Sequence, residues 1–228
     1  MKAIELLEKL KEKPVFKIQD VERVAYCNRR CAKLILSRLK KRKLIKQVTK
    51  NVYTTKDNIF VIASNVTYPS YISFWSASYF LGYTEQIINT FQVATTRRIN
   101  QIKFENYNIK FIKLNDFFGY KKIRTDEGDI FISENEKLLI DAFLKPKEFG
   151  NLDEIEKVFE NTIVSKEKVV NYLKKVKRQS VTKRVGFLLE KIKGYDISKL
   201  FKLDKNYILL NPFSKQWKKI NSKWRIKI

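Results

Sequence analysis

The sequence has 228 residues, of which 44% are hydrophobic and 13% aromatic, so it can form a packed core and does not have the composition of a disordered chain. Its 48 Lys and Arg residues against 24 Asp and Glu give a net charge of +24, an excess that indicates a polyanionic partner. There is no histidine, and the two cysteines are Cys27 and Cys31. This excludes most metal sites and most nucleophile–base pairs, so we expect no cofactor, no metal and no catalytic residues.

Two kinds of polyanion, a membrane surface and a nucleic acid, are compatible with this charge. No apolar run approaches the roughly 20 residues that a membrane span needs. The N-terminal segment MKAIELLEKLKEK lacks the apolar stretch and the small-residue cleavage site of a signal peptide. We therefore expect a cytoplasmic protein that does not contact a membrane and whose partner is a nucleic acid.

The positive charge is concentrated at the two ends of the chain. Residues 1–56 carry 17 basic and 5 acidic residues, a net charge of +12, and residues 161–228 carry 19 and 4, a net charge of +15. Residues 57–160 carry 12 and 15, a net charge of −3. Nucleotide bias or a hot habitat is an alternative origin of a lysine excess, but it does not confine the excess to two segments. We expect a folded middle region flanked by two electrostatic surfaces.

Three short helices are predicted in the first 42 residues. Leucines recur at helical spacing in residues 2–12, and Pro14 follows that helix. A second helix fits residues 18–25, and Asn28 can cap a third that extends to about Arg42. Residues 44–48 and 52–54 then have the pattern of two strands, joined by a tight turn in which Asn51 tolerates a left-handed backbone. The order of these elements predicts a winged helix-turn-helix domain over residues 1–58.

The third predicted helix and the segment after it contain no acidic residue between Glu22 and Asp57. Crowding one sign of charge on a helix is unfavourable, which suggests a binding surface, although some winged helices dock proteins instead. In helix-turn-helix domains the N-terminal part of the second helix of the motif enters the major groove. The candidates for contacts with base edges are Arg29, Arg30, Lys33 and Ser37. The candidates for contacts with phosphates are Arg38, Lys40, Lys41, Arg42, Lys43, Lys46 and Lys50.

The rest of the chain, residues 59–228, is predicted to form one mixed domain, which makes the fold class α+β. Residues 68–81 have the pattern of a core helix closed by Gly82, and residues 134–144 that of a helix ended by Pro146. Between them, four β-rich segments predict a small, largely antiparallel sheet: residues 90–96, 109–114, 119–124 and 129–133.

A basic, mainly helical tail is predicted from about residue 152. Its helices are expected at residues 152–160, 165–178 and 182–192, and short strands near residues 207–210 and 223–228. Basic residues cluster where two of these helices meet, which predicts a second surface for phosphates or for an acidic partner. A solvated lysine face is the alternative. The cluster consists of Lys174, Lys175, Lys177, Arg178, Lys183 and Arg184.

Carboxylates in the middle region leave an enzymatic alternative open. Near a strand and with Lys145 beside them, such residues can serve metal-dependent phosphodiester cleavage. Their spacing is loose, however, and turns and the first turns of helices favour acidic residues in any case. We therefore expect a protein that is not an enzyme, with a metal-dependent nuclease as the alternative. The carboxylates are Asp126, Glu127, Asp129, Glu134, Glu136 and Asp141.

Residues 68–98, with the sequence YPSYISFWSASYFLGYTEQIINTFQVATTRR, resemble the AbiEi family of antitoxins and transcriptional regulators in type IV toxin–antitoxin systems. In that family a helix beginning Pro-Ser-Tyr-Ile-Ser is followed by segments similar to Gly-Leu-Thr-Glu-Gln and Val-Ala-Thr-Thr. Shorter matches occur at residues 136–143, at RVGFLLE (184–190) and at the closing WRIKI (224–228). With the predicted winged helix, the resemblance covers nearly the whole chain. Lys43 and Asn51 depart from the pattern, because such winged helices commonly carry glycine at these two places.

The resemblance implies a function that composition alone does not. It implies a repressor that binds double-stranded DNA in its own promoter, at inverted repeats, as a homodimer or as cooperating monomers. It also implies an antitoxin that counteracts a nucleotidyltransferase-like toxin, and in type IV systems the two proteins need not touch. A winged-helix regulator unrelated to any toxin is the alternative.

Overall fold

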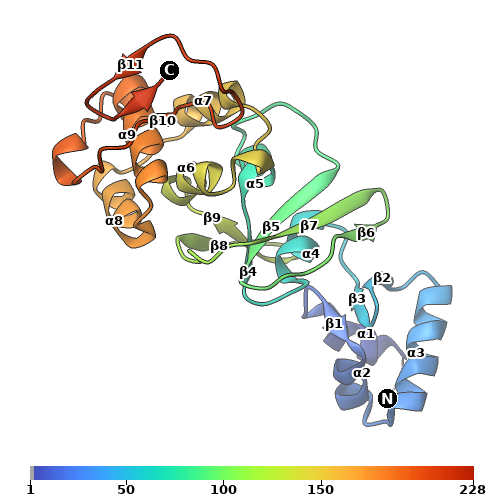
Figure 1. Cartoon of the computed structure of the whole chain (residues 1–228). Helices are drawn as coiled ribbons and strands as arrows, with labels where there is room; N and C mark the ends of the chain where they lie inside the picture. The colour runs from blue at the N-terminus through green and yellow to red at the C-terminus, as the bar shows by residue number, and fades with distance from the viewer. Residues whose placement is uncertain (1–2) are drawn as a thin grey trace. The chain divides into compact units, whose positions relative to one another are not determined.

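A computed structural model describes residues 3–228 and shows a mixed α+β protein, which confirms the predicted fold class (Figure 1). The chain forms two compact units, each built from segments that are separate in the sequence. The first unit contains residues up to Ile72 together with residues 89–115 and 121–132, and the second contains residues 73–88, 116–120 and 133–228. Among the described residues, no helix is long and apolar enough to cross a membrane.

The N-terminal part of the first unit contains the three predicted helices. Their buried side chains, among them Leu10, Val21 and Leu36, form one hydrophobic cluster. The two predicted strands are present, and a third short strand, β1, pairs with β3 to give a sheet of order β1-β3-β2. Lys2, where the first predicted helix begins, lies outside the described residues. The elements are α1 (Ala3–Lys11), β1 (Phe16–Lys17), α2 (Ile18–Ala25), α3 (Arg29–Lys41), β2 (Lys46–Thr49) and β3 (Val52–Thr54).

A short helix, α4 (Ile59–Asn65), leads into a six-stranded sheet of order β6-β7-β5-β4-β9-β8. The pairs β4–β5 and β6–β7 are antiparallel, whereas β4–β9 and β5–β7 are parallel. The sheet is therefore mixed, and the prediction of a small, largely antiparallel sheet was wrong. The strands are β4 (Ser70–Ile72), β5 (Thr90–Thr95), β6 (Ile102–Phe104), β7 (Tyr107–Lys113), β8 (Tyr120–Thr125) and β9 (Gly128–Ser133).

The single helix predicted over residues 68–81 is also corrected, because this segment contains strand β4 followed by the short helix α5 (Phe74–Phe80). Tyr71 and Ile72 are fully buried. Ile72 pairs with Val93 on one side and with Ile132 on the other, so β4 lies inside the sheet with neighbours at both edges. Backbone pairing with two distant strands outweighs the local preference of this apolar run.

The second unit is organised around α6 (Asn135–Leu144), which is buried from Glu136 to its last residue and contacts four other helices of the unit (Figure 1). An ion pair between Lys137 and Asp141 lies inside it, and Ser73 Oγ donates a hydrogen bond to Asp141 at 2.8 Å. The tail is mainly helical, as predicted. Its elements are α7 (Leu152–Asn161), α8 (Lys166–Val176), α9 (Gln179–Lys193), β10 (Ile208–Leu209), β11 (Ile220–Asn221) and β12 (Ile226–Lys227), with 3-10 turns at Pro146–Glu148 and Ser198–Leu200.

Candidate nucleic-acid interface

Helix α3 presents the four residues proposed for base contacts on its exposed surface. Asn28 caps the helix, since its Oδ1 accepts a hydrogen bond of 3.0 Å from the Cys31 amide. Ala32, Leu36 and Leu39 are 0%, 2% and 4% exposed and fix which side of the helix faces the core. The spacing of 3.6 residues per turn then leaves the polar positions outside. The side chains of Arg29, Arg30, Lys33 and Ser37 are all exposed.

Most of the residues proposed for phosphate contacts are exposed as well. They continue from the C-terminal half of α3 into the turn between β2 and β3. Lys43, just after α3, and Asn51, in the turn between β2 and β3, have φ angles of 57° and 63°. This is the left-handed backbone that glycine adopts most easily. Lys40 Nζ donates a hydrogen bond of 3.0 Å to Gln47 Oε1, which ties the helix to β2. The exposed members are Arg38, Lys40, Lys41, Arg42, Lys43 and Lys50.

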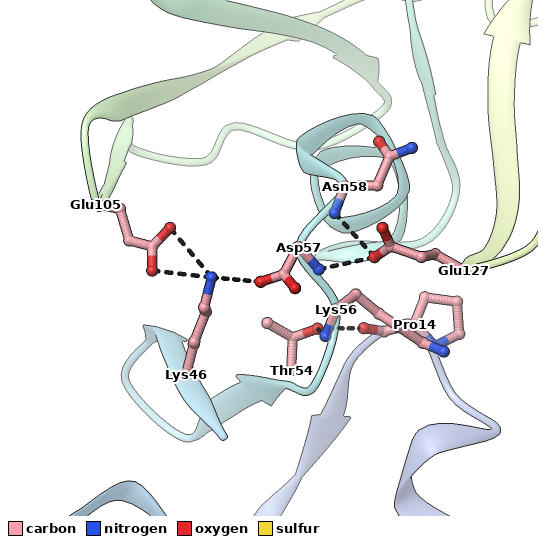
Figure 2. A network of polar contacts seen from close by, with 8 residues as sticks. All are labelled: Pro14, Lys46, Thr54, Lys56, Asp57, Asn58, Glu105 and Glu127. Carbon is pink, nitrogen blue, oxygen red and sulfur yellow. Dashed lines mark hydrogen bonds and ion pairs between the residues drawn. The ribbon is translucent and has the colours of Figure 1, made fainter. Parts of the chain in front are cut away.

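Lys46 differs from these residues, because its ammonium group is held by two carboxylates of the same unit. Lys46 Nζ lies 2.6 Å from Asp57 Oδ1 and 3.1 Å from Glu105 Oε1 (Figure 2). The hydrogen bond with Asp57 raises the pKa of Lys46 above its ordinary value. Glu105 belongs to the turn between β6 and β7, so the contact joins β2 to the larger sheet. In this conformation Lys46 is an internal ion-pair partner, not a free cation.

A second carboxylate contact holds the start of α4 in the same region. Glu127 Oε2 accepts hydrogen bonds from the amides of Asp57 (2.7 Å) and Asn58 (2.9 Å) (Figure 2). The Asn58 side chain in turn caps the helix by accepting from Phe60 and Val61. A carboxylate at a helix N-terminus is favoured by the helix dipole. These contacts join β2 and the start of α4 to the β6–β7 and β8–β9 turns of the larger sheet.

A shallow groove of about 520 Å³ lies between the β2–β3 turn and β6. Lys40, Lys50 and Lys103 line it together with Lys46 and Glu105. Lys103 was missed by the sequence analysis, because β6 was not predicted. The alternation of Ile102, Lys103 and Phe104 is a strand signal, but three residues are too few to stand out. The structure thus adds an exposed lysine to the basic surface of the first unit.

The second predicted basic surface is only partly present. Lys174, Lys175, Lys177 and Arg178 are exposed, and Arg178 pairs with Asp116 at 3.2 Å. Lys183, by contrast, is 1% exposed and does not belong to a surface. Its ammonium group lies 2.7 Å from Asp204 Oδ1 and 2.5 Å from the carbonyl oxygen of Asn206. Arg184 is half-buried, and its Nε donates a hydrogen bond of 2.9 Å to the carbonyl oxygen of Leu209.

Of the six carboxylates considered for nuclease chemistry, Asp126 is exposed in the turn between β8 and β9, and the other five are engaged in separate structural contacts. Asp129 pairs with Lys122 at 3.1 Å, and Glu127 binds the amides at the start of α4. In the second unit, Glu134 and Glu136 both pair with Lys168, and Asp141 pairs with the buried Lys137. Within residues 3–228, no group of three or more His, Cys, Asp or Glu side chains is arranged to hold a metal ion.

Comparisons with known proteins give a fold but no family. No protein-family model matches the sequence, and no curated protein matches it. Among solved structures, the crystal structure of the RV2827C protein from Mycobacterium tuberculosis is similar, with a TM-score of 0.63. The match covers 98% of this chain and 90% of that one, at 13% sequence identity. The two proteins share an overall fold across nearly their whole length.

Proposed function

We propose that this protein is a DNA-binding transcriptional repressor whose N-terminal segment is a winged helix-turn-helix domain. The observation that carries the proposal is the exposed, capped N-terminal half of α3, with Arg29, Arg30 and Lys33 on its surface and no acidic neighbour in the sequence. Arginine and lysine at such positions recognise guanine in the major groove. The β2–β3 hairpin that follows, with Lys50 in its turn, has the position and charge of a wing.

The two basic groups have different roles in this proposal. Arg29, Arg30, Lys33 and Ser37 read bases, and each good base contact contributes about 1–3 kcal/mol of discrimination. The exposed lysines and arginines after Ser37 contact phosphates and contribute affinity that falls with salt. The protein binds and does not catalyse, so we expect no nicking of plasmid DNA in Mg²⁺ or Mn²⁺.

The antitoxin part of the proposal is supported by the resemblance of residues 68–98 to the AbiEi family. On that basis the protein represses its own operon at inverted repeats in the promoter, as a homodimer or as cooperating monomers in the cytoplasm. It counteracts a nucleotidyltransferase-like toxin from the same operon without needing to touch it. Coexpression tests this directly: growth arrest by the neighbouring gene product, relieved by this protein, is the expected result.

A regulator without a toxin is the second candidate, because the exposed basic residues of α3 would account for DNA binding without any toxin. The neighbouring gene separates the two. A nucleotidyltransferase-like gene next to this one supports the antitoxin, whereas growth that is unaffected by every neighbouring gene supports the regulator alone.

DNA recognition is tested by comparing two duplexes of equal length, one from the gene's upstream region and one with that sequence scrambled. We expect tighter binding to the upstream duplex, with a salt dependence that corresponds to about 5–10 phosphate contacts. Arg30→Ala is expected to weaken binding to the upstream duplex and to leave binding to the scrambled duplex nearly unchanged. Equal loss on both duplexes would contradict base recognition by α3.

A further inference from the structure

A pocket of about 430 Å³ near the C-terminus combines cations with aromatic rings. Arg184, Lys215 and Lys227 supply its positive charges, and Tyr207 and Trp217 supply its rings. Among the residues that the structure describes, no carboxylate side chain lines it. The whole pocket lies in the second unit, far in sequence from α3 and the β2–β3 turn.

Arg184 is the first indication of what the pocket binds. The residue is half-buried, its Nε donates a hydrogen bond to the carbonyl oxygen of Leu209, and its guanidinium carbon lies 5.9 Å from the centre of the Phe143 ring. Burial lowers the pKa of Arg184, and no ion pair joins it to a carboxylate within the part of the chain that the structure describes. A half-buried cation without an anion is unfavourable, so an incoming anion is stabilised there. The planar guanidinium group is well suited to a phosphate.

The aromatic side chains are the second indication. Trp217 is 45% exposed and Tyr207 is 43% exposed, whereas Trp224, in the same segment, is fully buried. The ammonium group of Lys227 lies 5.1 Å from the centre of the Trp217 ring, so a cation and an accessible ring occur side by side. Exposed aromatic rings beside basic side chains are typical of sites where unpaired bases stack.

The charge of the surrounding segment indicates which class of ligand the pocket binds. Residues 205–228 contain seven basic residues and no acidic one. Such a segment favours a polyanion over a neutral molecule. In a duplex the base faces are covered by neighbouring bases, so only a single strand offers them to Trp217.

We propose that this pocket binds one nucleotide of a single-stranded nucleic acid, with its base against Trp217 and its phosphate at Arg184 and Lys215. The site uses none of the residues proposed to bind the duplex in the first unit and does not depend on them. It gives the protein a second mode of nucleic-acid binding that uses stacking and charge without reading a sequence.

The test measures binding of a fluorescently labelled oligo(dT) and an oligo(rU) of about 12 nucleotides by anisotropy. Trp217→Ala is expected to weaken binding about tenfold, the loss of one stacked base. Lys215→Glu is expected to weaken it as well. Two exposed residues outside the pocket provide matched controls: Phe213→Ala for the loss of an aromatic ring and Lys199→Glu for the reversal of charge. Both controls should bind as the unchanged protein does.

Two further arms separate this site from the proposed duplex-binding surface. The double variant Arg30→Ala/Lys33→Ala should lose binding to the upstream duplex and keep binding to the oligonucleotides. Trp217→Ala should lose binding to the oligonucleotides and keep binding to the upstream duplex. If Trp217→Ala binds the oligonucleotides as tightly as the unchanged protein, or if thymidine monophosphate binds as tightly as oligo(dT), the proposal is overturned.

Discussion

Lys46 and Lys50 lie four residues apart near the same hairpin, yet the structure leads us to expect different effects on DNA binding. The Lys50 side chain is exposed, whereas Lys46 is paired with Asp57 and Glu105. A lysine that contacts a phosphate contributes about 0.9 to the slope of log affinity against log salt. Between about 50 and 200 mM salt, one such contact therefore accounts for about a 3.5-fold change in affinity.

The perturbation is Lys50→Gln, compared with the double variant Lys46→Gln/Asp57→Asn. The double variant removes one positive and one negative charge, so it keeps the net charge of the cluster. Exposed ion pairs contribute little to stability, and we expect the double variant to fold normally. Lys50→Gln should reduce the salt slope by about 0.9, and the double variant should leave it unchanged.

The assay is a salt titration of anisotropy with the upstream duplex, carried out at near-neutral pH, where Lys46 stays protonated. The ordinary pKa of lysine, about 10.4, already ensures this, and the hydrogen bond with Asp57 raises the pKa of Lys46 further. If the double variant loses as much slope as Lys50→Gln, Lys46 leaves its carboxylates to contact a phosphate. The assignment of Lys46 to the internal network would then be wrong.

Three further predictions concern stability, each measured by urea denaturation. Gly186→Ala places a methyl group where the fully buried indole ring of Trp224 lies, so it should destabilise by about 1–3 kcal/mol; a stabilised variant, as expected for Gly to Ala in an open helix, would contradict this packing. Asn28→Ala removes the cap of α3 and should cost about 1 kcal/mol and weaken duplex binding; unchanged stability would show that the cap contributes nothing. The hydrogen bond from Lys183 holds the pKa of Asp204 in the folded protein below the ordinary value of 3.8. The stability that Asp204 contributes is therefore fully present above pH 3.8 and is lost as the pH falls through the lower pKa of the folded protein. Asp204→Asn should therefore lower stability at neutral pH and flatten its decline in acid, and a decline identical to that of the unchanged protein would refute the role of this pair.

Contiguous, amphipathic elements could be predicted from the sequence alone. The helices α2, α3 and α7 begin and end within about two residues of their predicted bounds. The exposure of Arg29, Arg30 and Lys33 was equally predictable, because the spacing of Ala32, Leu36 and Leu39 decides which side of α3 is buried. That these residues bind DNA remains a prediction.

Whether a short apolar run forms a helix or a strand depended on the tertiary structure. Residues 70–72 are compatible with a helix or a strand, since Ser70, Tyr71 and Ile72 are too few to show a clear period. Their partners are Val93 in β5 and Ile132 in β9, which follow far along the chain. The mixture of parallel and antiparallel pairs in the sheet also depends on long-range contacts, because the direction of a pair is set by which distant strands become neighbours.

The same limit applies to the charged residues of the candidate sites. A run of lysines in the sequence does not show which of them has a partner. Lys46 meets Glu105, 59 residues away, and Lys183 meets Asp204, 21 residues away, so two cations expected on binding surfaces are already paired with carboxylates of the protein. Local spacing determines which side of an element faces solvent. Whether an exposed or buried charge is free to bind a ligand depends on long-range contacts, which form only when the chain folds.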